Sequence, residues 1–281
     1  MAEKVTLATL KKYKQQARPI TMLTCYDYAA AILLEQAGVD GIIVGDSLAQ
    51  VMLGYDSTLQ ANMDLMVTLT AAVRRGAPNV YLVGDMPFLS YQLSTEQAIL
   101  NAGKFLREAS CDAVKFELDH RYVELVEELA RAGIPVMAHL GYRPQAAGLK
   151  AQVVETRAAE QAEILIRDAQ DVAAAGACSL LLECVTTMTA KAVTDRVDIP
   201  VISCGSGPHC DGQVIVLHEL LDLPGASGPR FCKKYAAIGE KIKQAIQTYI
   251  HEVRDRKFPD DQHSYHMTPE AQAELEKRLQ S

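Results

Sequence analysis

Short apolar runs alternate along this chain with longer segments in which apolar residues recur at helical spacing. A run of four or five apolar residues is typical of a buried strand, whereas apolar residues three and four apart indicate a helix packed on one face. The pattern predicts eight strands, at about Ile20–Thr24, Gly41–Gly45, Val80–Gly84, Ala113–Glu117, Val136–His139, Ser179–Glu183, Val201–Cys204 and Val214–His218. Between them it predicts helices at about Tyr28–Ala37, Asn62–Arg75, Thr95–Ala109, Tyr122–Ala132, Arg157–Ala175 and Met188–Val197.

Strands that alternate with helices of this length indicate right-handed crossovers and a parallel sheet. Eight such units favour a closed (β/α)8 TIM barrel over an open doubly wound sheet, and no Gly-x-Gly-x-x-Gly motif follows the first strand. Two further helices are expected at Phe231–Arg254 and Thr268–Gln280, with a polar linker at Asp255–His266. We therefore predict one domain over residues 1–281, with the barrel at about 18–254 and a C-terminal linker and helix at about 255–281.

The composition is that of a folded protein with a large core, because 49% of the residues are hydrophobic and 22% are charged. A formal net charge of −7 argues against a nucleic-acid surface, which needs clustered Lys and Arg. Seven scattered cysteines without a Cys-x-x-Cys pair are typical of a reducing compartment. With no signal peptide or membrane-length apolar stretch expected, the prediction is a cytoplasmic protein without membrane contacts.

Polar residues able to do chemistry stand at the ends of five of the predicted strands. They are Asp46 and Ser47, Asp85, Lys115 and Glu117, His139, and Glu183. The carboxyl ends of the strands of a β/α barrel surround a single point, where the active sites of this fold lie. Four carboxylates, a lysine and a histidine in this register indicate a metal-assisted site for an anionic substrate.

Asp46 and Asp85 each follow a glycine, and a pair of carboxylates at a barrel mouth suits Mg²⁺. The alternative is that each aspartate caps the helix that follows it. Lys115 and Glu117 are two residues apart and so point the same way in a strand. They either form an ion pair with each other, or bind the substrate carboxylate and the metal.

Glu183 ends a strand of three leucines, and an apolar wall disfavours the charged carboxylate, which suits a general base. The alternative is an ordinary rim carboxylate bonded to Arg or Lys. His139 could donate to a substrate oxygen or be a satisfied core histidine. Cys204, His209 and Cys210 could be zinc ligands, but no second ligand pair accompanies them.

The sequence resembles the ketopantoate hydroxymethyltransferase family, within the phosphoenolpyruvate/pyruvate-type barrel superfamily. The matching stretches run in family order over roughly residues 8 to 266. They are Thr24-Cys-Tyr-Asp-Tyr28, Val44-Gly-Asp-Ser-Leu48, Gly54-Tyr-Asp-Ser-Thr58, Ala72-Val-Arg-Arg-Gly-Ala-Pro78, Gly84-Asp-Met-Pro-Phe88, Val114-Lys-Phe-Glu117, His139-Leu-Gly141 with Pro144-Gln145, Leu182-Glu-Cys-Val185, Ile199-Pro-Val-Ile202 and Cys210-Asp-Gly-Gln213.

The resemblance implies that Asp46 and Asp85 bind Mg²⁺, which chelates 3-methyl-2-oxobutanoate, with Glu117 supporting the metal site. It further implies that Ser47 and Lys115 hold the substrate carboxylate, that His139 contacts a substrate oxygen, and that Glu183 removes the proton from C3. The resulting enolate would take a one-carbon unit from 5,10-methylenetetrahydrofolate and give 2-dehydropantoate, on the way to pantothenate.

The chain departs from the family pattern in three places: Leu118-Asp119 replaces a glycine pair, Ala146–Glu155 replaces a glycine-rich stretch, and Leu69 replaces a histidine. The altered loops leave open a Mg²⁺-dependent aldolase or C–C lyase acting on another 2-oxo acid. A barrel that has lost catalysis and serves as a scaffold is a further alternative, although every expected catalytic residue is present. The resemblance and the C-terminal helices predict a homo-oligomer, with a decamer as one candidate.

Overall fold

The protein is described by a computed structural model that covers residues 3–147, 154–225 and 228–280. The chain divides into two compact units, Met1–Tyr235 and Ala236–Ser281. The boundary falls just ahead of the long helix that the sequence predicted near the C-terminus.

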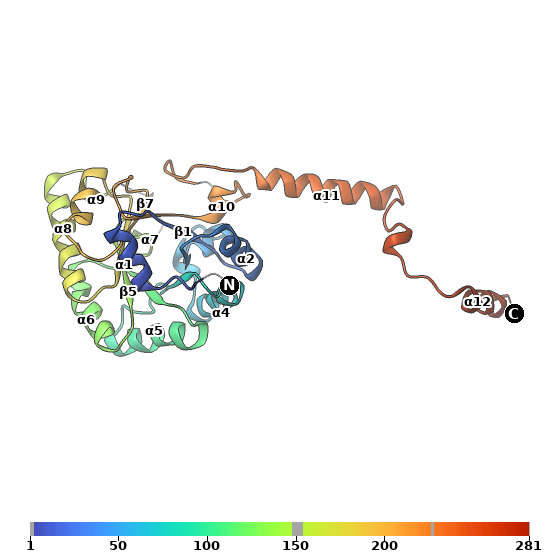
Figure 1. Cartoon of the computed structure of the whole chain (residues 1–281), viewed down its shortest axis with the longest axis horizontal. Coiled ribbons are helices and arrows are strands. Elements are labelled where there is room, and N and C mark those ends of the chain that lie inside the picture. The colour runs from blue at the N-terminus through green and yellow to red at the C-terminus, as the bar shows by residue number, and fades with distance from the viewer. Residues whose placement is uncertain (1–2, 148–153, 226–227, 281) are drawn as a thin grey trace. The chain divides into compact units, whose positions relative to one another are not determined.

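The first unit is a closed barrel of eight parallel strands, in which each strand pairs with the next in the chain and β8 pairs with β1 (Figure 1). Its strands are β1 (Ile20–Thr24), β2 (Gly41–Val44), β3 (Tyr81–Asp85), β4 (Ala113–Glu117), β5 (Val136–Gly141), β6 (Ser179–Glu183), β7 (Val201–Cys204) and β8 (Gly212–Ile215). The predicted (β/α)8 barrel is confirmed.

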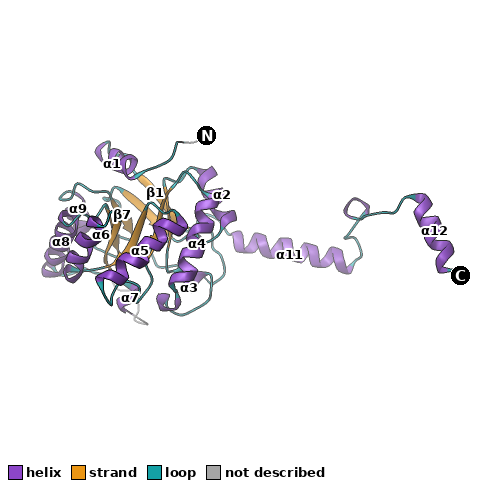
Figure 2. Cartoon of the chain, turned by 90° about the horizontal axis from the view of Figure 1, so that it is seen from below, coloured by secondary structure: helices purple, strands orange, loops and turns teal. Residues whose placement is uncertain are grey.

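Helices surround the strands on the outside (Figure 2). The helices of this unit are α1 (Leu7–Gln15), α2 (Tyr28–Ala37), α3 (Leu48–Val51), α4 (Met63–Gly76), α5 (Thr95–Ala109), α6 (Val123–Arg131), α7 (Pro144–Ala147), α8 (Ala159–Ala174), α9 (Thr187–Thr194) and α10 (Leu217–Leu220), with 3₁₀ turns η1 (Thr58–Gln60) and η2 (His120–Tyr122). Polar N-caps begin several of them: the side chains of Asp27, Asn62 and Ser94 accept from backbone N–H groups of α2, α4 and α5.

Most predicted elements differ from the observed ones by a few residues at their ends, and two differ most. The eighth strand is Gly212–Ile215 rather than Val214–His218, because the apolar run continues into α10, where Leu217 is buried. The strand begins at Gly212. A Cβ there would lie 2.6 Å from the backbone oxygen of Ile20, so a larger residue would not fit against β1. The helix expected from Phe231 begins only at Ile238. The first helix, α1, was not predicted.

The barrel has two apolar layers. Outward-facing strand residues pack with the surrounding helices, while a second cluster fills the interior of the barrel. The interior cluster contains Leu10 of α1, which is fully buried together with residues such as Ile20, Tyr81 and Val83. Helix α1 therefore closes the amino end of the barrel. The carboxyl end of the strands is the end at which a functional site is expected.

At the amino end, an aspartate precedes three of the strands and joins each to the strand on one side of it. Asp40, Asp112 and Asp211 accept hydrogen bonds from backbone N–H groups of Thr21, Leu82 and Val201, at 2.8, 2.9 and 2.8 Å. Each aspartate also pairs with a cation, Arg18, Arg74 or Lys14 respectively. At this end of the barrel, hydrogen bonds to aspartate carboxylates therefore join neighbouring strands.

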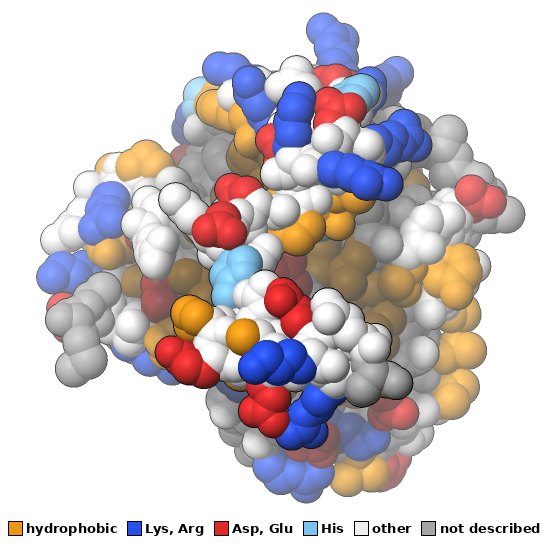
Figure 3. Space-filling model, turned by 90° about the vertical axis from the view of Figure 1, so that its right-hand side faces the viewer, with side chains coloured by type: hydrophobic (Ala, Val, Ile, Leu, Met, Phe, Trp, Pro, Cys, Tyr) orange, Lys and Arg blue, Asp and Glu red, His pale blue; other side chains and the backbone are white. Residues whose placement is uncertain are grey.

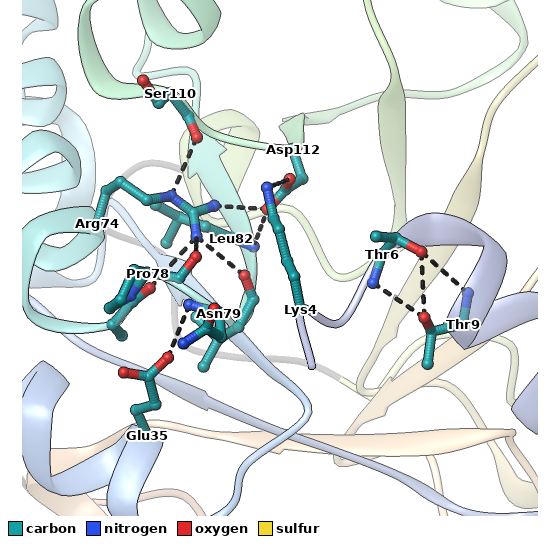
Figure 4. Close-up of polar contacts among 12 residues, drawn as sticks. Lys4, Thr6, Thr9, Glu35, Arg74, Pro78, Asn79, Leu82, Ser110 and Asp112 are labelled. Atoms are coloured by element: carbon teal, nitrogen blue, oxygen red, sulfur yellow. Dashed lines mark hydrogen bonds and ion pairs between the residues drawn. The ribbon is translucent and has the colours of Figure 1, made fainter. Parts of the chain in front are cut away.

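Arg74 makes the most extensive of these connections (Figure 4). Its guanidinium donates to the backbone oxygens of Ser110, Pro78 and Val80, and it lies 2.5 Å from Asp112. Lys4 pairs with the other oxygen of Asp112. One side chain of α4 thus binds the segments that lead into β3 and β4.

The second unit contains α11 (Ile238–Arg254), the 3₁₀ turn η3 (Asp261–His263) and α12 (Pro269–Leu279). Ile242, Ile246, Tyr249 and Val253 of α11 are all at least 42% exposed. Their spacing of three and four residues places them in one apolar stripe. Within the part of the chain that the structure describes, no helix is both long and apolar enough to cross a membrane.

Candidate active site

The candidate site is one layer of side chains at the carboxyl end of the barrel. Interior residues such as Val83, Met137 and Leu181 belong to the apolar cluster, and the residue two positions later in each strand points the same way. These next residues line a single cavity of about 310 Å³ and include Thr24, Asp85, Lys115, His139, Glu183 and Cys204. The period of the strand therefore places polar groups directly above the apolar core.

Six of the seven predicted site residues line this cavity: Asp46, Ser47, Asp85, Lys115, His139 and Glu183. Strand register explains part of the arrangement, because Asp85 is paired with Lys115, and Gly141 with Glu183. The seventh residue, Glu117, is also buried, but it is not among the described residues that line the cavity.

Asp85 is the most enclosed of the carboxylates. Its Oδ2 accepts from Lys115 Nζ and from the backbone N–H of Asp46, both at 2.9 Å. Its Oδ1 is buried and has no hydrogen-bond partner among the described residues. These contacts join neighbouring strands, whereas a helix cap would accept an N–H of its own helix. Lys115 forms its ion pair with Asp85.

His139 connects Lys115 to Glu183. Lys115 Nζ lies 3.4 Å from Nδ1 of His139, and because an ammonium group can only donate, Nδ1 must accept. The imidazole proton of a neutral His139 is then on Nε2, which lies 3.3 Å from Oε2 of Glu183. This approach is close enough for attraction but not aligned as a hydrogen bond. Among the described residues, Nε2 thus has no hydrogen-bond partner.

Excess negative charge in a buried space sets the protonation of the site. Burial raises the pKa of Asp85 to about 7, although the Lys115 charge opposes this. Burial, and then the Asp46 charge, raises the pKa of Glu117 to about 9. Burial alone would lower the pKa of Lys115, but Asp85, Asp46 and Glu117 outweigh it and raise that pKa. The acidic side chains around the ammonium group thus hold the lysine charged.

The pKa of His139 moves in the opposite direction. Burial lowers it most, followed by the charge of Lys115. His139 is therefore neutral at physiological pH, which agrees with the assignment of its proton to Nε2.

Sequence reasoning missed several residues of the site. Glu219 of α10 lines the cavity. The thiol of Cys232 donates a hydrogen bond to Oε2 of Glu219, with a distance of 2.8 Å between sulfur and oxygen. Tyr26 is buried and shares a 2.8 Å hydrogen bond with Ser47. Gln145 bonds both Asp46 and Glu117. Tyr26 and Gln145 belong to stretches that carried the family resemblance. Neither residue lies at the end of a predicted strand, so the sequence provided no reason to assign it a role.

Among the described residues, no group of three or more His, Cys, Asp and Glu side chains is arranged to hold a metal ion. This applies to Cys204, His209 and Cys210, and to the carboxylates of the cavity taken as a protein-only ligand set. The altered stretch Ala146–Glu155 falls mainly on residues 148–153, which lie outside the described residues.

Comparison with known proteins decides the family. Residues 4–261 match the family model described as ketopantoate hydroxymethyltransferase. The chain is 43% identical over 269 residues to 3-methyl-2-oxobutanoate hydroxymethyltransferase of Carboxydothermus hydrogenoformans, covering 95% of this chain and 98% of that protein. It is 46% identical over 266 residues to the protein of the same name from Geobacillus thermodenitrificans, covering 94% of this chain and 95% of that protein.

The chain belongs to the ketopantoate hydroxymethyltransferase family. It is an enzyme of the hydroxymethyltransferase class, as the sequence predicted. The predicted family resemblance is confirmed.

Solved structures show the same barrel in more distant proteins. The phosphoenolpyruvate phosphomutase of Streptomyces platensis subsp. rosaceus superposes with a TM-score of 0.61 at 14% identity, covering 98% of this chain and 97% of that chain. A phosphonopyruvate hydrolase in complex with oxalate and Mg²⁺ gives a TM-score of 0.61 at 13% identity, covering 98% and 97%. At these identities the likeness shows a shared fold between the hydroxymethyltransferase family and these proteins.

Proposed function

We propose that this protein transfers a hydroxymethyl group to 3-methyl-2-oxobutanoate and produces 2-dehydropantoate, a precursor of pantothenate. The one-carbon donor in this proposal is 5,10-methylenetetrahydrofolate. Family membership supports the reaction class. The observation that carries the proposal is the single cavity in which Asp46, Asp85, Lys115, His139 and Glu183 meet.

The residues of the cavity fit a divalent cation. Asp85 Oδ1 is a buried carboxylate oxygen without a hydrogen-bond partner among the described residues, and the Asp46 side chain lines the same cavity. Hard carboxylate oxygens in a site with surplus negative charge suit Mg²⁺, which often takes one or two protein carboxylates and completes its octahedron with water and substrate. We propose Asp46 and Asp85 as the ligands. Glu117 supports the site without occupying the cavity wall.

A bound Mg²⁺ would acidify C3 of the keto acid by stabilising the negative charge that develops on the carbonyl oxygen. Lys115 stays protonated and is buried beside the cavity, which supports a role in holding the substrate carboxylate. Ser47, which lines the cavity and shares a hydrogen bond with Tyr26, would donate to the same group. The Nε2–H group of His139 would donate to a substrate oxygen.

We propose Glu183 as the base that removes the C3 proton. Its carboxylate is largely enclosed, with 15% of the side chain exposed, and it lies beside the neutral imidazole of His139. Because this imidazole is neutral, it leaves the negative charge of Glu183 available to accept a proton. The apolar Leu181, two residues earlier, lines the same wall.

Incubation of the enzyme with 3-methyl-2-oxobutanoate in D₂O, with and without methylenetetrahydrofolate, tests the proposal. We expect C3 deuterium exchange with the keto acid alone and 2-dehydropantoate when the folate is added. Exchange without that product would instead favour the Mg²⁺-dependent aldolase or C–C lyase acting on another 2-oxo acid. An enzyme that produced neither exchange nor product would contradict both.

We further propose a cytoplasmic homo-oligomer, with a decamer as the candidate assembly. Free thiols at all seven cysteines support a reducing compartment. The apolar stripe of α11 supports self-association, because contiguous exposed apolar surface marks contact sites. Both basic and acidic side chains appear on the surface drawn in Figure 3.

A further inference from the structure

Gln145 is a buried amide whose polar groups are all engaged. It lies in α7, directly after β5, and is 4% exposed. Its backbone N–H faces both carboxylate oxygens of Glu117, at 3.0 and 3.1 Å. Its side chain makes three further hydrogen bonds. Together these contacts reach a residue just after β2, a residue just after β3, the end of β4 and the loop before α5.

The contacts fix the orientation of the side-chain amide. Nε2 donates to Oδ2 of Asp46 at 2.9 Å and to the backbone oxygen of Met86 at 3.0 Å, so both amide hydrogens are used. Oε1 accepts from the hydroxyl of Tyr91 at 2.9 Å. A flipped amide would turn its oxygen toward two acceptors, and the observed orientation is therefore the only one that satisfies all three partners.

This arrangement solves a local electrostatic problem. Asp46 and Glu117 are both buried, 5% and 4% exposed, and a carboxylate in a buried site needs donors to remain stable. Gln145 supplies an N–H to each of them and carries no charge of its own. Its side chain occupies Oδ2 of Asp46, which restricts the rotation of that carboxylate.

We propose that Gln145 is a positioning residue that holds the Asp46 carboxylate in the orientation needed to bind the divalent cation. This inference rests on the proposed function, since it concerns the cation that Asp46 would bind. Outer groups that orient metal ligands typically contribute about 10- to 100-fold in metal affinity or activity.

The substitution Gln145→Met tests the side-chain contacts alone, because it keeps the length of the side chain and the backbone N–H to Glu117. Calorimetric titration with Mn²⁺, on enzyme saturated with 3-methyl-2-oxobutanoate, gives the metal dissociation constant. We expect about 10- to 100-fold weaker binding. Saturating Mg²⁺ should then restore much of the C3 exchange rate, because the residue acts on metal binding and not on the reacting atoms.

Tyr91→Phe provides a second variant that keeps Gln145 itself. It removes the hydrogen bond to Oε1 and should weaken Mn²⁺ binding less than Gln145→Met does. In the double variant the Tyr91 substitution should add little, because both changes release the same side chain. Should Gln145→Met fail to fold, Tyr91→Phe alone decides: unchanged Mn²⁺ affinity in that variant overturns the proposal.

Thr70→Ala is the control, since Thr70 is buried and its hydroxyl donates to the backbone oxygen of Met66 within α4. It should lower thermal stability and leave the Mn²⁺ dissociation constant within about twofold of the parent, inside the usual additivity error for distant sites. A folded Gln145→Met variant with parental Mn²⁺ affinity overturns the role of Gln145 alone. A parent enzyme that binds no divalent ion overturns the metal site as well.

Discussion

At the scale of single residues, the site follows from the two-residue period of a strand. Val83 and Asp85 point to the same side of β3, as do Leu181 and Glu183 of β6. In each pair the first residue lies in the apolar interior and the second lines the cavity above it. Because Asp85, Lys115, His139 and Glu183 stand near the carboxyl ends of the predicted strands, the sequence predicted that they lie around one point. It could not place Gln145, because Gln145 lies on a short helix where no strand period applies. It also could not show that Glu117 turns to a backbone N–H.

Replacing the proposed base should stop proton removal and spare binding. Glu183→Gln keeps the shape of the side chain but cannot accept the C3 proton, so we expect the C3 exchange rate to fall by about 10²- to 10⁴-fold. Calorimetry should show nearly unchanged affinity for the keto acid. A variant that exchanges deuterium at the parental rate would remove Glu183 from the role of base.

The raised pKa of Asp85 predicts a pH dependence of metal binding. Its ordinary value is 3.8 and burial raises the pKa to about 7 in the folded protein. The proton therefore stabilises the metal-free fold at low pH, and that contribution is lost as pH rises toward and through 7. Because protons compete with the metal for this carboxylate, Mg²⁺ should raise the melting temperature more at pH 8 than at pH 6.

Thermal unfolding with and without MgCl₂ at the two pH values measures this difference. Asp85→Asn, which cannot titrate, is the control and should show a much smaller pH effect. An equal or larger Mg²⁺-induced shift at pH 6 in the parent would contradict the expectation.

At the scale of elements, the spacing of apolar residues predicted most strands and helices, but not those set by tertiary contacts. The eighth strand was misplaced because Ile215, Val216 and Leu217 continue one apolar run although the backbone changes from strand to helix. Leu217 begins α10, with its N–H bonded to Thr24 Oγ1 of β1. Because Thr24 is nearly two hundred residues away in the sequence, the local pattern around Leu217 could not predict this contact.

The charged contacts at the amino end predict a stability effect that is separate from catalysis. Arg74 and Asp112 are only 12% and 17% exposed, so Arg74→Met leaves a mostly buried aspartate and several backbone oxygens without this donor. We expect a loss of about 2–3 kcal/mol in the free energy of unfolding by urea, somewhat below the value for a fully buried pair. The C3 exchange rate of the folded variant should be unchanged.

Arg131→Met on α6 is the matched control, because Arg131 is 63% exposed and pairs with the exposed Glu127 and Glu128. It should change the unfolding free energy by no more than about 1 kcal/mol. Equal effects of the two substitutions would show that the amino-end contacts do not stabilise the barrel beyond an ordinary surface pair.

At the scale of the whole molecule, the sequence predicted the closed barrel because eight strand-helix units recur with short connections. The C-terminal unit was harder to predict. Phe231 has the hydrophobic spacing of a helix, yet it lines the cavity and lies so close to Gly205 that a Cβ there would be 2.4 Å from its ring. Packing against the barrel mouth, which local pattern does not encode, thus keeps Phe231 out of α11.

The apolar stripe on α11 predicts an effect on assembly. Ile246 is 53% exposed within the stripe, and a charge there would disfavour its burial against another copy. Sedimentation velocity should show a homo-oligomer for the parent and smaller species for Ile246→Glu. A monomeric parent, or an unchanged Ile246→Glu distribution, would contradict the proposed role of the stripe.

The central claim is that a divalent cation held by Asp46 and Asp85 activates C3 of a 2-oxo acid for proton removal. Its most direct test is the rate of C3 deuterium exchange of 3-methyl-2-oxobutanoate in D₂O, followed by proton NMR without any folate. We expect rapid exchange with Mg²⁺, loss of exchange after removal of the metal with EDTA, and recovery when Mg²⁺ is restored. Full exchange by the metal-free enzyme would contradict the claim.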